Sequence, residues 1–316
     1  MGQKYLITGG AGFIGSNYLN LFVLKNKDDF FICLDSLTYA GDILYINKLL
    51  SCDNFKFVKG DIRDCNQVFS LFESEKIDIV INFAAETHVD NSIVNGDLFF
   101  DTNVFGTKVL LDACLKYGVK RFHQISTDEV YGNNVYNTKF KETSLLNPSS
   151  PYSASKAAAD LLVLSYYKTY GLPVTISRSC NNYGLNQHKE KLIPNIVDKI
   201  KNNNTISIYG DGENKREWIY VLDHCHAVDA IIKYGKVGEI YNIGSSVEFS
   251  NNEIVAKILS LFNCDRKLIK YVVDRKGHDF RYGIDTTKIF VECKWKPIYS
   301  FEEAFYSTIN HLKSSK

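Results

Sequence analysis

Tyr152 and Lys156 stand four residues apart in the run Tyr152-Ser153-Ala154-Ser155-Lys156, at the start of an expected helix over 152–170. Residues at this spacing share one helix face, so the phenol and the ammonium can enter the same pocket. A lysine cation beside a phenol favours the phenolate and lowers a pKa that starts near about 10. The pair could therefore take the proton from an alcohol that is being oxidised. Such pairs are also common on helix surfaces, so this role depends on the rest of the chain.

A second reactive group is the run Thr127-Asp128-Glu129, which directly follows an apolar, strand-like segment over 121–126. Doubly wound α/β folds bind their ligands at the carboxyl ends of the strands. Two adjacent carboxyl groups at that edge could act as an acid and a base. A solvated acidic loop would have the same sequence, and spacing alone leaves both interpretations open.

A glycine pattern typical of dinucleotide binding opens the chain. The apolar run 4–8 leads into Gly9, Gly12 and Gly15, and a helix is expected over 16–24. This strand, turn and helix would let the backbone approach a pyrophosphate. Asp35 ends the next apolar run, 30–34, and its carboxylate would bind ribose hydroxyls and repel a 2′-phosphate. The pattern therefore predicts NAD rather than NADP.

The elements that must position these residues alternate between strand-like and helical runs. Further strands are expected at 55–58, 77–85, 121–126 and 172–178, and their near-continuous apolar character suits parallel strands buried on both faces. We predict an α/β fold with a Rossmann-type doubly wound parallel sheet. An NAD-binding domain would cover residues 1–178, and a smaller, interleaved C-terminal substrate lobe would cover 179–316. A strand-like run at 239–244 is expected to rejoin the first sheet.

Composition argues against several other classes of protein. The 37 basic and 36 acidic residues give a net charge of +1, which disfavours nucleic-acid or membrane binding through bulk charge. The 8 cysteines are scattered without a CxxC pair, as expected for reduced thiols in the cytoplasm. Adjacent His224-Cys225-His226 point in different directions from a helix or strand, so we predict no metal site there. Local cations such as Lys191, Arg216 and Arg275 could neutralise a diphosphate.

Taken together, the glycine and Tyr/Lys motifs resemble those of the extended short-chain dehydrogenase/reductase superfamily. Four further segments closely resemble the dTDP-glucose 4,6-dehydratase family, and the resemblance covers about residues 4–299. The run Thr127-Asp128-Glu129, in the segment 126–132, is the most specific of them. The segments are 35–41, 126–132, 181–184 and 277–282.

The resemblance implies a reaction in three stages. Enzymes of this family oxidise the sugar C4 hydroxyl, eliminate water across C5 and C6, and return the hydride to C6. Tyr152 would take the C4 hydroxyl proton, and Lys156 would also hold the nicotinamide ribose. Glu129 would be the C5 base and Asp128 the C6 acid, while Thr127 would hydrogen-bond the C4 oxygen. Epimerase-like relatives that return hydride to C4 have no use for this acid pair.

The resemblance also implies binding residues and an assembly. The helices at 99–117 and 152–170 would pack across a homodimer as a four-helix bundle, although the apolar Leu161, Leu162 and Leu164 suit a core equally well. Asp61 would lie near adenine, or it is an ordinary turn aspartate. The NAD-binding residues would be Gly9, Gly12, Phe13, Ile14, Gly15, Asp35, Ser36, Leu37, Thr38, Asp61, Ile62, Ala84, Ala85, Thr102, Tyr152, Lys156 and Asn182. The sugar-nucleotide residues would be Thr87, Thr127, Asp128, Glu129, Asn181, Lys191, Leu192, Ser207, Ile208, Tyr209, Arg216, Asn251, Asp274, Arg275, Lys276, Gly277 and His278.

Some positions depart from the family pattern. His188 and Lys189 replace an aromatic residue and a proline, and Lys276 stands where proline is usual. These changes concern nucleotide selection more than catalysis. The alternatives are a UDP-glucose 4,6-dehydratase, a sugar-nucleotide 4-epimerase, or a catalytically silent NAD-binding scaffold.

Overall fold

A seven-stranded parallel sheet forms the base of the computed structural model, which describes residues 2–134, 136 and 138–314. The spatial order is β10-β6-β5-β4-β1-β2-β3, so the strand order reverses between β1 and β4. This is a doubly wound sheet with its switch point beside β1, and the predicted fold class is confirmed. The strands are β1 (Lys4–Thr8), β2 (Phe30–Asp35), β3 (Phe55–Lys59), β4 (Ile79–Asn82), β5 (Arg121–Thr127), β6 (Val174–Ser179) and β10 (Ile240–Ile243).

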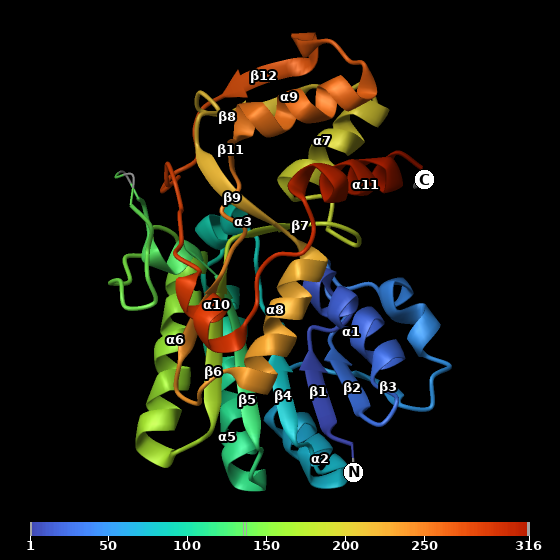
Figure 1. Cartoon of the computed structure of the whole chain (residues 1–316), viewed down its shortest axis with the longest axis vertical. Helices are drawn as coiled ribbons and strands as arrows, with labels where there is room; N and C mark the ends of the chain where they lie inside the picture. Colours follow the sequence, from blue (N-terminus) through green and yellow to red (C-terminus); the bar gives the residue numbers. More distant parts are fainter. Residues whose placement is uncertain (1, 135, 137, 315–316) are drawn as a thin grey trace.

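Helices cover both faces of this sheet (Figure 1). One face packs against α1 (Phe13–Lys25), α8 (Val221–Tyr234) and α10 (Thr287–Cys293), and the other against α2 (Cys65–Glu75), α5 (Thr107–Tyr117) and α6 (Pro151–Tyr170). Neighbouring residues of β1 serve different cores, because Leu6 packs in the cluster with α2 and α5 whereas Ile7 packs in the cluster with α1 and α8. Burial on both faces explains the uninterrupted apolar runs in the sequence.

The expected helix at 99–117 is divided into three parts. A short α4 (Asp97–Phe100) leads into a π-helical turn, η2 (Asp101–Gly106), and then into α5. Asn103 in the π-helical turn is buried, donates to the Glu86 carbonyl at 3.1 Å, and accepts from the Glu86 amide at 2.9 Å. The π turn therefore fixes the loop that follows β4.

The second lobe lies above the carboxyl ends of the strands (Figure 1). A buried cluster that includes Ile193, Ile254 and Phe305 forms its core. Because α8, β10 and α10 return to the first sheet, the later half of the chain contributes to both lobes; the division at residue 178 stays a prediction. The lobe contains β7 (Asn181–Tyr183), β9 (Lys215–Tyr220) and β11 (Glu248–Ser250) in one sheet, β8 (Ile206–Tyr209) and β12 (Ile269–Val272) in another, and α7 (Leu192–Lys201), α9 (Asn251–Phe262) and α11 (Phe301–Ser314).

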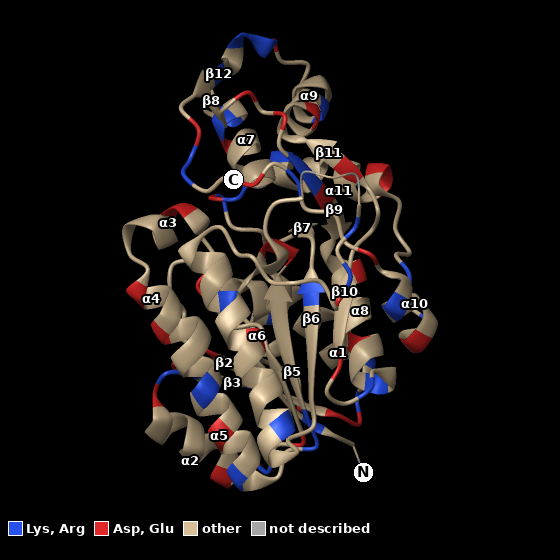
Figure 2. Ribbon diagram, turned by 90° about the vertical axis from the view of Figure 1, so that its left-hand side faces the viewer, with Lys and Arg blue, Asp and Glu red and all other residues tan. Residues whose placement is uncertain are grey.

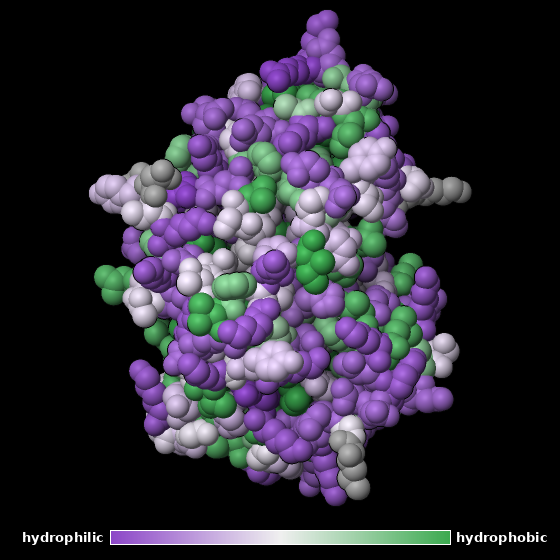
Figure 3. Space-filling model, viewed as in Figure 1, coloured by the Kyte–Doolittle hydropathy of each residue, from purple (hydrophilic) through white to green (hydrophobic). Residues whose placement is uncertain are grey.

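Short helical turns connect these elements. They are η1 (Ile43–Leu49), η3 (Asp128–Tyr131), η4 (Arg266–Leu268) and the one-and-a-half-turn α3 (Val89–Val94). Basic and acidic residues are interspersed over both lobes (Figure 2), and apolar residues on the face seen in Figure 3 are scattered among hydrophilic ones. Within the described part of the chain, no helix is both long enough and apolar enough to cross a membrane.

Candidate active site

One cavity of about 330 Å³ opens where the strands of the large sheet end and the second lobe begins. This size falls within the range of about 300–1,000 Å³ that is typical of small-molecule sites. Its walls include Gly9 after β1, Ala84 after β4, and Ser179 at the end of β6, so it lies at the switch point of the sheet. Trp218 of β9 and Leu192 of α7 close it from the second lobe.

The structure brings most predicted site residues to this cavity. All the predicted NAD-binding residues line it except Leu37, whose amide instead donates to Asp35 at 2.8 Å. The sugar-nucleotide candidates in its wall are Thr87, Thr127, Asp128, Glu129, Asn181, Lys191 and Leu192. The candidates outside the wall are Ser207, Ile208, Tyr209, Arg216, Asn251, Asp274, Arg275, Lys276, Gly277 and His278.

Glycine is required in the turn after β1. Gly9 has φ +65°, and a Cβ added there would lie 2.6 Å from the Ala84 nitrogen. A Cβ on Gly15 would lie 2.4 Å from the Gly9 oxygen. Gly12 caps α1 without a side-chain hydrogen bond, so the first amides of this 13-residue helix remain available as donors. A smooth backbone cradle with free amides fits the pyrophosphate of NAD.

The two acids of the cofactor half have different surroundings. Asp35 is buried and accepts hydrogen bonds from the Ala11 and Leu37 amides at 2.9 and 2.8 Å. Burial raises its pKa, while the two amides lower it. Each carboxylate oxygen keeps a lone pair for a ribose hydroxyl. Asp61 instead forms a two-point ion pair with Arg63, and this hydrogen bond lowers the pKa of Asp61.

Tyr152 is held in the first turn of α6. Ser150 and Ser153 form a reciprocal cap there, with Pro151 as the first helical residue. The Lys156 ammonium donates to the Ile125 carbonyl at 2.6 Å, and burial lowers the pKa of Lys156 to about 8. The pKa of Tyr152 is raised, first by burial and then by the charge of Glu129, while a hydrogen bond with Thr127 lowers it. The expectation of a lowered phenol pKa is therefore wrong for this structure, because burial raises it and the Lys156 ammonium is held at the Ile125 carbonyl.

The pKa of Lys156 leads to a prediction about stability. The charged ammonium is 4% exposed, so at pH 7 the folded protein carries its desolvation cost. Lys156→Met should raise the free energy of unfolding by about 2 kcal/mol at pH 7, after loss of the Ile125 hydrogen bond is subtracted. The parent protein should gain stability as pH rises from about 8 towards about 10, because the unfolded chain then binds the extra proton. Urea unfolding of both proteins across this range tests it, and a gap that widens with pH would contradict it.

Asp128 and Glu129 occupy different electrostatic environments. Asp128 is 1% exposed, and its Oδ2 has no hydrogen-bond partner among the described residues. Burial, followed by the charges of Glu129 and Glu217, raises the pKa of Asp128 well above its ordinary value. Burial also raises the pKa of Glu129, but Arg275, Arg216 and Lys191 oppose this rise. Asp128 is therefore the carboxyl group that holds a proton, and Glu129 is the one that releases it more readily.

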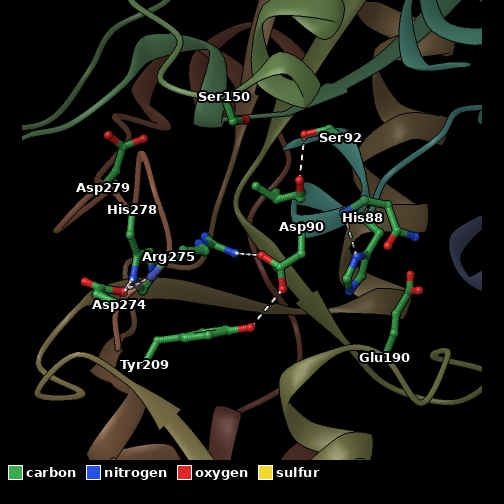
Figure 4. A network of polar contacts seen from close by, with 12 residues as sticks. His88, Asp90, Ser92, Ser150, Glu190, Tyr209, Asp274, Arg275, His278 and Asp279 are labelled. Carbon is green, nitrogen blue, oxygen red and sulfur yellow. Dashed lines mark hydrogen bonds and ion pairs between the residues drawn. The ribbon is translucent and has the colours of Figure 1, made fainter. Parts of the chain in front are cut away.

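The three expected diphosphate cations are used in different ways. Lys191 lines the cavity, and its ammonium donates to the Thr87 carbonyl at 2.9 Å. Arg216 is buried, stacks 4.4 Å above the Tyr282 ring, and donates to backbone carbonyls such as that of Asp279. Arg275 belongs to the loop after β12, and its side chain lies beside Asp90 of α3 (Figure 4). Only Lys191 therefore reaches the cavity wall directly.

Other sugar-nucleotide candidates belong to the second lobe. Ile208 is 3% exposed and packs in the core of that lobe, so only its backbone could meet a ligand. Asn251 begins α9, and Ser207 and Tyr209 are exposed on β8. The segment from Asp274 to His278 forms a loop in which His278 Nδ1 lies 2.6 Å from Asp274 Oδ1.

Several cavity residues were not found from the sequence. Glu86, Gln187, Glu190 and Trp218 line the wall but carry no spacing signal. His224 was considered only as a metal ligand, yet it is fully buried with Nδ1 at 2.8 Å from Asn182 Oδ1. Across the described ranges, no group of three or more His, Cys, Asp or Glu side chains is placed to hold a metal ion.

Comparison with known proteins gives matches over most of the chain. The family model described as GDP-mannose 4,6 dehydratase matches residues 6–308. The low-salt glycan biosynthesis protein Agl12 of Haloferax volcanii is 49% identical, over 97% of this chain and 97% of its own. The dTDP-glucose 4,6-dehydratase of Salmonella typhimurium is 41% identical, over 97% of this chain and 92% of its own.

Solved structures add the fold and the cofactor. The dTDP-glucose 4,6-dehydratase DesIV of Streptomyces venezuelae, crystallised with NAD, matches with a TM-score of 0.94 and 42% identity over 98% of this chain and 96% of its own. A UDP-glucose 4-epimerase of Thermotoga maritima matches with a TM-score of 0.91 and only 28% identity, over 98% and 99%. The fold is thus shared with epimerases, whereas sequence identity favours the dehydratases. The chain belongs to the GDP-mannose 4,6 dehydratase family, in the branch of the dTDP-glucose 4,6-dehydratases.

Proposed function

We propose that this protein is an NAD-dependent dTDP-glucose 4,6-dehydratase, which converts dTDP-glucose into dTDP-4-keto-6-deoxy-glucose and water. The observation that carries this function is the contrast between Asp128 and Glu129 at the end of β5. An elimination needs a carboxyl group that gives a proton and another that takes one. Burial keeps Asp128 protonated, while three cations favour the ionised form of Glu129. Several dTDP-glucose 4,6-dehydratases among the relatives support the same reaction.

The cofactor half of the cavity fits NAD in its residues and shape. The turn from Gly9 to Gly15 and the start of α1 would hold the pyrophosphate, and Asp35 the adenosine ribose. Lys156 and Asn182 would hold the nicotinamide end. When bound, NAD supplies the acceptor for the C4 hydride and later returns that hydride to C6.

Tyr152 begins the reaction by accepting the C4 hydroxyl proton as the C4 hydride leaves. Its hydroxyl must first lose its own proton, and burial beside Glu129 opposes this loss. The Thr127 hydrogen bond favours the phenolate and would also hold the C4 oxygen. The product of this stage is a C4 ketone, which acidifies the hydrogen on C5.

Glu129 then removes the C5 proton, and Asp128 gives its proton to the departing C6 hydroxyl. Water leaves and a double bond forms between C5 and C6. Hydride returns to C6 and a proton to C5, which gives the 4-keto-6-deoxy sugar. Glu129, whose proton exchanges with solvent, supplies the proton that returns to C5. Asp128 regains a proton from solvent and Tyr152 releases the C4 proton to solvent, so all three groups recover their initial protonation states over the cycle.

The remaining features of the proposal concern location and assembly. The eight cysteines, all within the described residues, are unpaired, which supports a reducing cytoplasm.

The π-helical turn and α6 expose Phe105 and Leu161, at 50% and 59%, which supports a homodimer through this helix face. Sedimentation of the purified protein tests that assembly. The product would enter deoxysugar biosynthesis, for example towards dTDP-rhamnose.

A product assay tests the proposed activity. The protein loaded with NAD is incubated separately with dTDP-glucose and with UDP-glucose, and the 4-keto product is detected by its absorbance in alkali. We expect keto product with dTDP-glucose and at least tenfold less with UDP-glucose, a difference of about 1.4 kcal/mol in transition-state binding. A galactose epimer without keto product would identify an epimerase. NAD binding with neither product would identify a scaffold.

A further inference from the structure

A single carboxylate, that of Asp90, joins the two lobes beside the cavity (Figure 4). Asp90 lies in the first turn of α3, whereas Tyr209 ends β8 and Arg275 follows β12 in the second lobe. The Tyr209 hydroxyl donates to Asp90 Oδ2 at 3.2 Å, and Arg275 Nη1 lies 3.8 Å from Asp90 Oδ1. Elements far apart in the sequence therefore meet at one side chain.

The contact with Asp90 leaves most of the Arg275 guanidinium unused. The distance of 3.8 Å between Arg275 Nη1 and Asp90 Oδ1 exceeds the usual hydrogen-bond range of about 2.7–3.2 Å. Arg275 Nε is buried without a hydrogen-bond partner among the described residues, and so is Asp90 Oδ1. Asp90 thus contacts Nη1 only, and the buried Nε has no acceptor among the described residues. A planar guanidinium edge is suited to binding two phosphate oxygens together.

Arg275 and Lys191 act on the same neighbouring ionisable groups. Burial lowers the pKa of Lys191, the charges of Glu190 and Glu129 raise it, and Arg275 lowers it while Asp90 raises it. Arg275 and Lys191 both oppose the rise in the pKa of Glu129. These side chains therefore share one region, between the cavity wall and the loop after β12. A diphosphate there would lie beside two cations of the second lobe.

We propose that Asp90 is a positioning residue for the substrate diphosphate. It holds Arg275 at Nη1 and Tyr209 at its hydroxyl, so that the Nε edge of the guanidinium is presented to the phosphates. This role rests on the proposed function, which supplies the diphosphate. If Asp90 acted through its charge alone, its removal would strengthen anion binding, because a negative group would be lost. If Asp90 instead orients Arg275, its removal should weaken anion binding.

Calorimetric titration of the NAD-loaded protein with dTDP and with thymidine tests this role. Asp90→Ala should weaken dTDP binding about tenfold, equal to about 1.4 kcal/mol, and leave thymidine binding within about twofold. Asp90→Asn keeps an acceptor for the Tyr209 hydroxyl, so its affinity for dTDP should fall between those of the parent and Asp90→Ala. The KM for dTDP-glucose should rise by the same factor, with kcat within about twofold of the parent value.

Asp53→Ala is the matched control. It removes the same charge from an exposed position before β3, at the amino end of that strand, and should not alter the affinity for dTDP or for thymidine. Equal or tighter dTDP binding by Asp90→Ala would overturn the positioning role, and so would an equal loss for dTDP and thymidine. If the parent protein itself does not bind dTDP, the proposed function fails and this role with it. A parent that binds dTDP beside an indifferent Asp90→Ala refutes the role of Asp90 alone.

Discussion

Glu129→Gln should keep C4 oxidation but lose proton removal at C5. Glutamine has the shape of glutamate without a basic oxygen, so the barrier to elimination rises while substrate binding is preserved. Loss of a general base typically costs about 10²–10⁴ in rate. In deuterated water, the parent protein should exchange the C5 hydrogen of dTDP-glucose intermediates with solvent. The variant should form enzyme-bound NADH, seen by its absorbance, without that exchange.

The neighbouring Asp128→Asn variant is the comparison for this experiment. It removes the proton donor rather than the base, so C5 exchange should persist while formation of keto product slows. The order of the two pKa values also predicts a bell-shaped dependence on pH. Activity should fall on the acid side as Glu129 becomes protonated, and on the alkaline side as Asp128 loses its proton. Exchange at the parent rate in Glu129→Gln would show that Glu129 is not the C5 base.

Most of the fold could be predicted because strands that are buried on both faces need near-continuous apolar runs, which are visible in the sequence. Leu6 and Ile7 face opposite cores, so both must be apolar, and the same holds along the other parallel strands. Gly9 and Gly15 are also recognisable in the sequence, because Gly9 has φ +65° and a Cβ on Gly15 would meet the Gly9 oxygen within the same turn. Steric necessity of this kind acts locally and therefore appears as a residue type at a fixed spacing.

The features that could not be predicted depend on tertiary neighbours. The π-helical turn at Asp101–Gly106 follows from the bonds of Asn103 to the Glu86 backbone, which no helix propensity reports. The pKa of Tyr152 is raised by burial and then by the charge of Glu129, which lies 23 residues earlier in the sequence. His224 meets Asn182 across 42 positions of sequence. Spacing along one helix cannot express any of these contacts.

Tyr152→Phe should abolish the first oxidation almost completely. Phenylalanine preserves the packing against Phe99, whose ring centre is 6.3 Å away, but it removes the hydroxyl oxygen that we propose as the acceptor of the C4 proton. The expected loss is about 10²–10⁴ in the rate of hydride transfer. In a single turnover with dTDP-glucose, the variant should form little enzyme-bound NADH, whereas the parent should form it rapidly.

Tyr166→Phe separates this effect from the mere loss of a hydroxyl on α6. Tyr166 lies on the same helix, but its hydroxyl binds Asp112, away from the cavity. This control should form NADH at the parent rate, even if its stability falls by about 1 kcal/mol with the lost hydrogen bond. Because Glu129 is unchanged in both variants, a block in Tyr152→Phe must lie before C5 proton removal, so C5 exchange should disappear together with NADH. NADH formation at the parent rate in Tyr152→Phe would instead mean that the C4 proton leaves by another route, and Tyr152 would have no part in the oxidation.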